Sequence, residues 1–548
     1  MCTARDDHDV WCIRSPNAYY PVDPDRCLPG PHGPCAAADG GIKRGRTVRR
    51  SSVLLVAVAL VGLAFNLASV SPALATGPTT WTYPGSCNTV TLQLCIDAAS
   101  SGDTIDLDAN DLSTEFAAIN KTLSISAAAG YSPTLLGVYV YDTPSATPVN
   151  VTLSGFTVTE DIQATFSVGG GDSLAISHVT VAQPASSYSS GPGISLDAEV
   201  PASFSVTASH VSFSNEYAGI DVFNNSSGAV SFQAIGNYIT AHGATYAGSA
   251  IELDTTSTGS MQANVMNNAI WDVANCNCGG ASGVFVYPQD TSTMNVNFVG
   301  NTLQGVRSSD IGVRNSLLAG GSAWLNVYNN IFAHATDAAI YLDDSESIVS
   351  RLAYHAGNND EFNNGLPDFL DGRSAGSGNL AVNPNLVSPS TGNLHLKSSS
   401  PLIDKGQVCS PGGVAISDAA GNNRVFGASM DLGAYERGAS APTGQVFIGG
   451  SGTDTITGTS GGDIICGMGG NDVLNGGGGN DFIDGGSGSD KVTGGPGADW
   501  LYGGAGGDTL CAKDGTGGND HVNGGAGTDG YQIDSGDSAV QVEHKVTC

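Results

Sequence analysis

A nine-residue repeat occupies the C-terminal part of this 548-residue chain and restricts its fold more than any other feature. Written G-G-x-G-x-D-x-U-x, with U a large apolar residue, it runs through seven contiguous units from 449 to 511. Three extra residues, 512–514, interrupt the count before two more units at 515–523 and 524–532. The sixth residue of all nine units is Asp, which gives the column Asp454, Asp463, Asp472, Asp481, Asp490, Asp499, Asp508, Asp520 and Asp529.

The spacing of this repeat predicts a parallel β-roll. The G-G-x-G-x-D half forms a tight turn, because glycine adopts positive φ without steric cost. The x-U-x half forms a minimal strand with U pointing inward. Two units complete one turn of the roll, so residues 18 positions apart, such as Asp454 and Asp472, stack on the same edge. A disordered Gly-rich tail would preserve neither the Asp column nor the apolar column.

Stacked aspartates of this kind predict calcium binding, since calcium takes six to eight hard oxygen ligands and the turns offer both carboxylates and carbonyls. We expect folding to require the metal, because aligned carboxylates repel and a thin apolar stripe does not offset the chain entropy. Affinity is expected in the range of roughly 10⁻⁴–10⁻³ M that is typical of extracellular modules. The pattern resembles the repeats-in-toxin (RTX) β-roll, and this resemblance implies that the nine column aspartates are calcium ligands.

A longer period governs the chain upstream of the repeats. Short apolar strands with a polar corner recur in steps of 27–33 residues, at His178, His210, Asn237, Asn268, Asn301 and Asn330. A second strand set keeps the same rhythm at positions 194, 220, 251, 284, 311 and 340. Two strand types that share one period predict stacked coils, whereas a β-sandwich would show turn signals every 8–12 residues. The expected fold class is therefore all-β, with a right-handed parallel β-helix over 76–437 followed by the calcium-binding parallel β-roll.

Two details of the β-helix follow from this pattern. Asn side chains at the fixed corner are expected to stack, to bond their amides to the next coil and to adopt left-handed backbone angles. A solenoid must also cover its open end. Residues 91–99 form an amphipathic helix in this interpretation, and a disulfide between Cys87 and Cys95 is the favoured pairing that would fix it.

Segments at both ends of the β-helix resemble known groups. Residues 91–107 (TLQLCIDAASSGDTIDL) look like the opening of exported bacterial right-handed β-helix repeat proteins. Residues 380–436 resemble the end of the choice-of-anchor Q group, most specifically through SPLIDKG (400–406) and DLGAYE (431–436). That group has no settled biochemical function, so the resemblance implies fold and export more than an activity.

The first 75 residues have the features of an export leader. A basic cluster at 43–50 precedes an apolar run at 53–65 and the small-residue pattern Ala73-Leu74-Ala75, as in a cleaved signal peptide. A retained anchor helix is the alternative, although a membrane span needs about 20 apolar residues. Residues 1–42 fit neither a signal nor a domain, and a translation start near Val48 is a hypothesis. We expect the protein to be secreted and extracellular, with no membrane span once the leader is cleaved.

Charge restricts the classes of partner that are expected, and the cysteine content indicates disulfides. The formal net charge of −31 disfavours nucleic acid and favours cations or neutral surfaces. Eight cysteines follow the leader, and an even number in an exported chain suggests disulfides, although eight cysteines allow 105 pairings. Zinc binding at Cys276 and Cys278 is the weaker interpretation. The remaining boundaries are a linker at 438–448, the roll at 449–532 and a C-terminal cap or tail at 533–548.

Two functional hypotheses stay open, and no catalytic residue is assigned. The first is a secreted, non-catalytic surface or matrix protein whose partners are calcium and a neutral or weakly charged polysaccharide. The second is a polysaccharide-active lyase, epimerase or hydrolase. A cleft with converging Asp, His and Arg would favour the enzyme, and a flat Asn/Ser/Thr surface would favour binding. The candidate side chains for catalysis are Lys121, Arg307, Arg314, Arg351, Arg373, His355, Asp343, Asp344, Asp368 and Asp371.

Overall fold

The computed structural model describes three short N-terminal strands and most of residues 78–548, apart from 88, 145–146, 184–190, 214–217, 242–247, 274–281, 344–350, 369 and 371–372. The chain divides into two units, of which the first comprises 1–79 with 277–279. In that unit β1 (Cys2–Ala4), β2 (Val10–Ser15) and β3 (Ala18–Tyr20) form an antiparallel sheet. The predicted signal segment, Cys276 and Cys278 lie outside the described residues. No helix in the described part of the chain is long and apolar enough to span a membrane.

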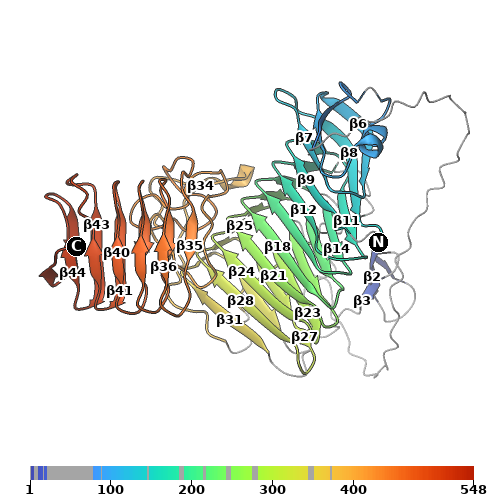
Figure 1. The fold of residues 1–548 in the computed structure, drawn as a ribbon. Coiled ribbons are helices and arrows are strands. Elements are labelled where there is room, and N and C mark those ends of the chain that lie inside the picture. Colours follow the sequence, from blue (N-terminus) through green and yellow to red (C-terminus); the bar gives the residue numbers. More distant parts are fainter. Residues whose placement is uncertain are drawn as a thin grey trace, which may run out of the picture. The chain divides into compact units, whose positions relative to one another are not determined.

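The second unit begins with a parallel β-helix, as the sequence predicts (Figure 1). Its longest sheet, called here the long sheet, has eleven strands. They are β4 (Thr80–Tyr83), β5 (Thr104–Leu107), β7 (Leu123–Ala127), β9 (Asn150–Ser154), β12 (Asp172–Ser177), β15 (Ala202–Thr207), β18 (Ala229–Ile235), β21 (Ser260–Met266), β24 (Thr293–Val299), β28 (Ser322–Tyr328) and β31 (Leu352–Gly357).

Two further strand sets complete each coil. The middle set pairs in parallel through β8 (Thr134–Tyr141), β11 (Ile162–Phe166), β14 (Ile194–Ala198), β17 (Ile220–Asn224), β20 (Ile251–Thr255), β23 (Val284–Asp290), β26 (Ile311–Arg314) and β30 (Ile340–Asp343). The short set is β10 (Thr157–Val158), β13 (Thr180–Ala182), β16 (His210–Ser212), β19 (Tyr238–Thr240), β22 (Ala269–Trp271), β25 (Thr302–Gln304), β29 (Ile331–Ala333) and β32 (Asp360–Phe362). Two shorter pairings add β6 (Asp111–Ile119) beside β8 and β27 (Ser316–Leu317) beside β23.

The prediction of two strand types per coil is therefore wrong, because a typical coil has three. The segments that the sequence presents as the first strand type each contain two strands and the corner between them. In the segment 176–181, β12 ends and β13 begins, and His178 lies between them in a left-handed conformation. A backbone turn of one residue leaves no Gly or Pro signal here, so the two strands look like one in the sequence.

Buried Asn side chains form a ladder along this corner, which confirms the predicted stacking. Asn268 is typical: its Nδ2 donates to Asn301 Oδ1 (3.0 Å) and to the Ala234 carbonyl (2.8 Å). The same Asn301 Oδ1 accepts the backbone N–H of Asn268 at 2.9 Å. The ladder members are fully buried, and they are Asn237, Asn268, Asn301, Asn330 and Asn359.

Two expectations for this corner need correction. His178 and His210 are not ladder members, because His210 pairs with Tyr238 and the ladder position before Asn237 is Ser209. The left-handed residues are also not the ladder asparagines but the residues directly before them, such as Asn267 (φ 54°) and Gly300 (φ 67°). The ladder side chain points inward from an ordinary backbone, and its predecessor makes the bend.

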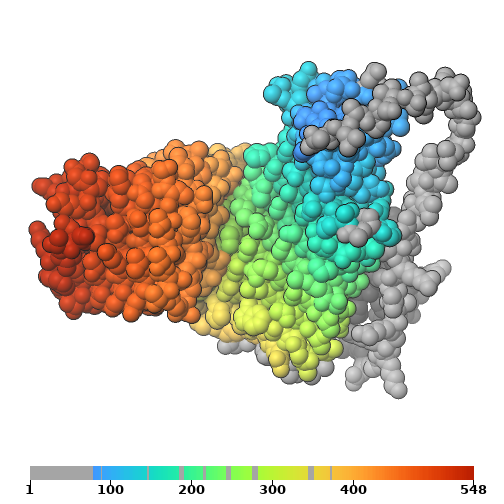
Figure 2. Space-filling model, in the orientation of Figure 1, coloured from blue at the N-terminus to red at the C-terminus, as the bar shows by residue number. Residues whose placement is uncertain are grey.

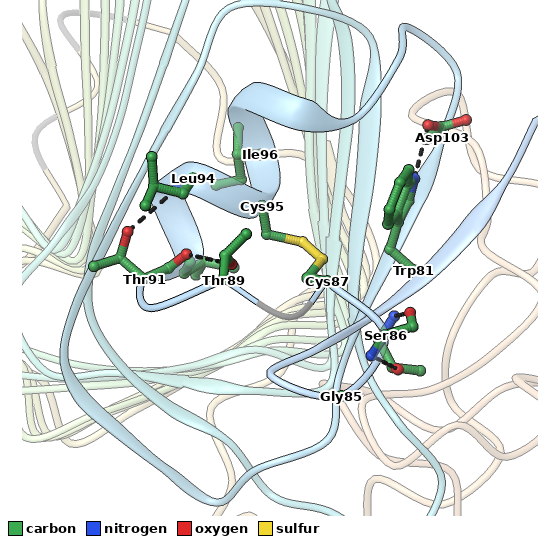
Figure 3. The surroundings of a disulfide bond; sticks show 12 residues. Trp81, Gly85, Ser86, Cys87, Thr89, Thr91, Leu94, Cys95, Ile96 and Asp103 are labelled. Atoms are coloured by element: carbon green, nitrogen blue, oxygen red, sulfur yellow. Dashed lines mark hydrogen bonds between the residues drawn. A yellow bond between two sulfur atoms is a disulfide. The ribbon is translucent and has the colours of Figure 1, made fainter. Parts of the chain in front are cut away.

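The N-terminal opening carries the predicted helix, α1 (Leu92–Ala98), shown in Figure 3. The Thr91 side chain caps it by accepting the Leu94 N–H, and Leu92 and Ile96 are buried in the β-helix core. A disulfide joins Cys87 to Cys95, which confirms that pairing. Lys121 Nζ donates to three carbonyls at the end of the helix, so this candidate base has a structural role.

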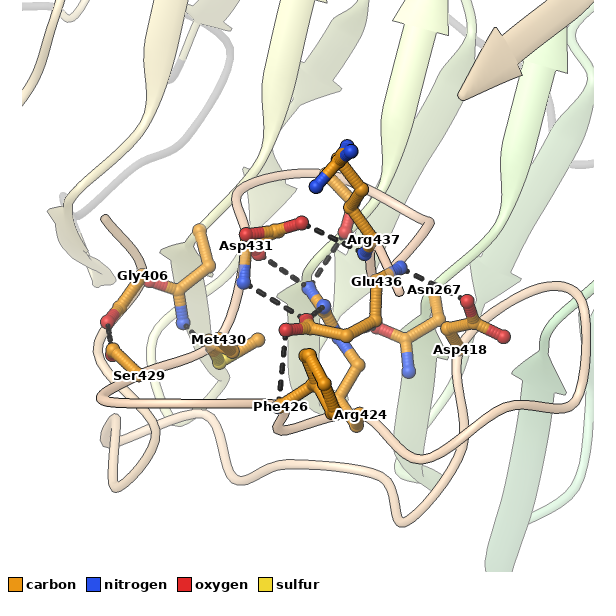
Figure 4. Close-up of polar contacts among 12 residues, drawn as sticks. Asn267, Gly406, Asp418, Arg424, Phe426, Ser429, Met430, Asp431, Glu436 and Arg437 are labelled. Atoms are coloured by element: carbon orange, nitrogen blue, oxygen red, sulfur yellow. Dashed lines mark hydrogen bonds and ion pairs between the residues drawn. The ribbon is translucent and has the colours of Figure 1, made fainter. Parts of the chain in front are cut away.

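Residues 380–436, called here the flank segment, pack against the side of the β-helix. They contain β33 (Leu386–Ser388), the 3₁₀ turn η2 (Pro389–Thr391) and β34 (Asn393–Leu396). Leu402, Leu432 and other apolar residues cover Ala269 and Ile331 of the short set. The fully buried Arg424 joins the two parts, since its Nη1 pairs with Glu436 at 2.9 Å and its Nε donates to Asn267 Oδ1 at 3.0 Å (Figure 4).

The C-terminal repeats form the predicted β-roll of two parallel six-stranded sheets. One sheet has β35 (Val446–Ile448), β37 (Ile464–Cys466), β39 (Phe482–Asp484), β41 (Trp500–Gly506), β43 (His521–Gly527) and β45 (Ser538–Val540). The other has β36 (Thr455–Thr457), β38 (Val473–Asn475), β40 (Lys491–Thr493), β42 (Thr509–Cys511), β44 (Gly530–Gln532) and β46 (His544–Lys545). The first strand thus lies within the expected linker, and the last two lie within the expected tail.

The apolar column of the repeat forms the core of the roll. Leu474, Ile483, Val492 and Leu501 are fully buried between the two sheets. Disulfides Cys409–Cys466 and Cys511–Cys548, which the sequence did not predict, attach the roll to the flank segment and close its C-terminal end. The Tyr502 hydroxyl also donates to the Ala428 carbonyl at 2.8 Å. The red and orange end of Figures 1 and 2 is this roll.

Candidate metal centre

The column aspartates stack along both edges of the roll, as their spacing predicts. From Asp472 onward, each column carboxylate uses Oδ1 to accept the backbone N–H of the column Asp one full turn earlier. Asp490 Oδ1 accepts the Asp472 N–H at 2.8 Å, and Asp499 Oδ1 accepts the Asp481 N–H at 2.9 Å. The three-residue insertion does not break the ladder, because Asp520 accepts the Asp499 N–H across a step of 21 residues.

The second carboxylate oxygen has no such bond in most of the column. Among the described residues, Oδ2 is buried without a hydrogen-bond partner in seven aspartates: Asp472, Asp481, Asp490, Asp499, Asp508, Asp520 and Asp529. Leaving a buried carboxylate oxygen unpaired is costly. In the first two units the oxygen has a partner, because Asp454 Oδ2 accepts the Gly450 N–H and Asp463 Oδ2 accepts the Thr459 N–H.

Five of the seven unpaired oxygens lie beside a carbonyl oxygen of the next turn, namely those of Asp472, Asp481, Asp490, Asp508 and Asp529. A Cβ atom placed on Gly467 would lie 2.6 Å from Asp472 Oδ2 and 2.6 Å from the Gly485 carbonyl oxygen. The same holds at the next turn, where a Cβ on Gly485 would lie 2.6 Å from both Asp490 Oδ2 and the Gly503 carbonyl oxygen. At these five turns the first glycine of the repeat leaves open a cradle in which a carboxylate and a carbonyl oxygen converge.

These cradles fit calcium. Calcium accepts carboxylate and backbone carbonyl oxygens together in a flexible geometry. No group of three or more His, Cys, Asp or Glu side chains in the described part of the chain could hold a metal. The backbone carbonyl oxygens that lie beside the column carboxylates would supply part of the ligand set, and glycine leaves the space between them open. When bound, the ion supplies positive charge between stacked carboxylates, and the chain's own residues hold and orient those carboxylates.

Burial and neighbouring carboxylates raise the pKa of several column aspartates. Burial raises the pKa of Asp481 to about 7, with a further contribution from the Asp463 carboxylate. Burial also raises the pKa of Asp499 to about 7, and the Asp481 and Asp520 carboxylates add to it. The pKa of Asp508 rises to about 6 for the same reasons. Ionising the column in the absence of a cation is thus unfavourable.

Two acidic residues that the repeat pattern missed end the columns. Asp537 Oδ1 accepts the Asp520 N–H at 3.4 Å, and Glu543 Oε2 accepts the Asp529 N–H at 2.6 Å. The sequence does mark Asp537, because residues 536–539 (GDSA) match the second half of a repeat. In the structure Ala539 takes the apolar position and packs against the core of the roll. Nothing in the sequence around Glu543 marks it as the end of the other column.

Comparison with known proteins identifies the repeats. Residues 448–483 and 475–510 match the RTX calcium-binding nonapeptide repeat family. The chain is therefore a parallel β-helix joined to an RTX-type calcium-binding roll, and the prediction of calcium as its cofactor is confirmed. No curated protein matches the chain in sequence.

Two solved structures show a low similarity to this chain. The crystal structure of pectate lyase Pel9A has 14% identity and a TM-score of 0.33, and the match covers 66% of this chain and 97% of the lyase. The PL6 family alginate lyase AlyGC has 11% identity and a TM-score of 0.23, over 85% of this chain and 80% of that protein. TM-scores this low support no argument, so the fold assignment depends on the strand register alone. The resemblance to the choice-of-anchor Q group stays a prediction.

The candidate catalytic residues do not converge in one cleft. Arg307 is exposed, with its Nη2 3.5 Å from Asp272 Oδ1, and Arg373 Nε donates to the Leu352 carbonyl. His355 lies on β31 and is exposed. Arg314 of β26 pairs in register with Asp343 of β30.

The other candidates are scattered as well. Asp368 is partly buried and accepts the Ile340 N–H at 2.9 Å. Arg351 is exposed at the start of the last long-sheet coil. Asp344 and Asp371 lie outside the described residues. Among the described candidates, the acids, the histidine and the arginines therefore do not share one site.

Proposed function

We propose that this chain is an exported, calcium-dependent, non-catalytic surface or matrix protein whose β-helix presents a carbohydrate-binding face. The observation that carries the proposal is the repeated cradle of one unpaired aspartate oxygen and one glycine carbonyl along both edges of the roll. Such a module folds when calcium fills the cradles. The column aspartates from Asp454 to Asp529 are the proposed ligands.

Export is supported by the disulfides, by the calcium sites and by the predicted leader. Three disulfides in the described part of the chain fit an oxidising compartment. Low-affinity calcium sites fill where calcium is millimolar, so the roll would order only after export. The cleavable leader predicted at 1–75 provides the route.

The test is a calcium titration of the full-length chain by isothermal calorimetry, with circular dichroism in calcium and in excess chelator. We expect several ions per chain and a gain of β-structure that calcium produces and magnesium does not, because magnesium demands a rigid octahedral site. Identical spectra with calcium and with chelator would reject the proposal.

A polysaccharide hydrolase is the second candidate function, and one observation on the middle set favours it. Asp221 of β17 pairs in register with Glu252 of β20, and both side chains alternate with buried residues, so they project outward. Neighbouring strands are about 4.8 Å apart, and two carboxyls about 5 Å apart suit a retaining glycosidase. Phe285 of β23 continues the same row.

Activity of the Asp221→Asn and Glu252→Gln variants decides between the two functions. Reducing ends released from a panel of polysaccharides would establish the hydrolase if both variants lost the activity. The control is Asp106→Asn, an outward acid on β5 that only accepts a bond from Ser126. Absence of product from every polysaccharide would leave the non-catalytic function as the conclusion.

A further inference from the structure

The outer face of the long sheet is uncharged over five consecutive strands. The strands β15, β18, β21, β24 and β28 contain no Asp, Glu, Lys or Arg at all. This is unusual for a chain with 51 acidic and 20 basic residues. The four last strands of this series are labelled in Figure 1, and Figure 2 shows their surface in green and yellow.

A groove of about 480 Å³ crosses this face. One register row runs along it from strand to strand, in the order Ser203, Ser231, Gln262, Asn295 and Trp324. Trp324 closes the row with 41% of its surface exposed, which is high for so large an apolar side chain. The groove thus combines one aromatic platform with hydroxyl and amide groups.

One polar atom of the groove needs a donor. Asn295 Oδ1 is buried and has no hydrogen-bond partner among the described residues. An unpaired buried acceptor costs free energy, and a rotation of the Asn295 amide toward the groove would let a ligand hydroxyl recover it. The corresponding atom in the neighbouring row is satisfied, because Asn264 Oδ1 accepts from Asn297 Nδ2 at 2.9 Å. The difference between the two rows points to a donor-bearing ligand over Asn295.

We propose that this groove binds an uncharged polysaccharide, which deepens the carbohydrate-binding part of the proposed function and rests on it. A sugar ring offers an apolar face that packs on Trp324, and its hydroxyls donate to Asn295 and bond to Gln262. The absence of charge on the five strands selects a neutral chain. A polyanion would find no cation in the groove and would be repelled by the acidic protein.

Affinity electrophoresis of the full-length chain tests this directly. Gels containing neutral glycans (amylose, xyloglucan, galactomannan, β-glucan) are compared with gels containing pectate or alginate, all with calcium. We expect retardation by at least one neutral glycan and none by the anionic ones. Trp324→Ala should weaken binding at least about tenfold, as truncating a central aromatic anchor does, while Trp324→Phe retains most of it.

The matched control is Phe116→Ala, because Phe116 is also 41% exposed but lies on β6, away from the groove. Unchanged binding in Trp324→Ala, retardation by anionic glycans alone, or no retardation by any neutral glycan would each overturn the proposal. Repeating the gels in chelator separates it from the calcium function. The groove lies in the β-helix, so its binding should persist when the roll has lost calcium.

Discussion

The substitution Asp481→Asn tests the calcium column most sharply. Asp481 lies in the middle of one edge, where its Oδ1 accepts the Asp463 N–H at 2.8 Å and its Oδ2 is buried without a partner. Asparagine can keep the Oδ1 acceptor and the volume but removes the charge facing the cradle. The variant should therefore lose a calcium ion and little else.

The size of the effect follows from linkage. With a dissociation constant of roughly 10⁻⁴–10⁻³ M and about 10 mM calcium, one lost ion removes about 1.4–2.7 kcal/mol of stability. Asp481→Ala should cost more, because it also leaves the buried Asp463 N–H unpaired, which adds about 1–3 kcal/mol. In calcium the wild type should be the most stable, Asp481→Asn less stable and Asp481→Ala the least stable.

Urea denaturation followed by circular dichroism in calcium measures these differences, and calorimetry counts the ions. The control is Asp484→Asn, because Asp484 is a neighbouring acid whose pKa burial raises to about 6 but which lies outside the column and accepts the Gly486 N–H. If Asp481→Asn binds as many ions as the wild type with the same urea midpoint, the column carboxylates are not ligands. Equal ion loss in Asp484→Asn would show that charge, rather than position, matters.

Three further predictions concern pH and packing. The pKa of column carboxylates such as Asp499 is raised to about 7 from 3.8, so the calcium-free roll should lose stability as pH rises from 4 to 7. Calcium affinity should increase over the same pH range. Circular dichroism in chelator measures the stability, and calorimetry at several pH values measures the affinity. Asn301→Ala leaves the buried Asn268 N–H unpaired, so the urea midpoint should fall by an amount equivalent to about 1–3 kcal/mol, whereas the half-buried Asn297→Ala should cost under about 1 kcal/mol. Arg424→Met leaves the buried Glu436 carboxylate without its cation, so the free energy of unfolding measured by urea denaturation should fall by about 3–5 kcal/mol. A change below about 1 kcal/mol would mean that this ion pair does not fix the flank segment.

The parts of the fold that repeat could be predicted from the sequence. A period of nine with an invariant Asp gave the roll and its metal, and a period near 30 gave the coils. Both signals are local, because each coil contacts mainly its neighbours and each unit repeats the same environment. For this reason the repeat period alone places Asn268 and Asn301 on one corner.

The parts that do not repeat could not be predicted in this way. The flank segment meets the β-helix through contacts such as Asn267 Nδ2 to the Ser417 carbonyl, 150 residues apart, and no periodicity links such positions. The sequence also does not predict the row of outward residues along the groove, for a different reason. Gln262 and Trp324 are outward residues that no packing constraint fixes, so only the strand register shows that they share one line.

The two ladders predict that calcium dependence is confined to the roll. An asparagine both donates and accepts, so Asn301 can accept from Asn268 while donating to Asn330 and to a carbonyl, and the stack is satisfied without a ligand. An ionised aspartate only accepts. Asp490 takes one N–H on Oδ1 and has no second donor for Oδ2, so every added turn adds another buried negative charge. Where the column is ionised a cation completes that stack, and we therefore expect chelation above pH 7 to unfold the roll while the Asn-laddered β-helix keeps its structure.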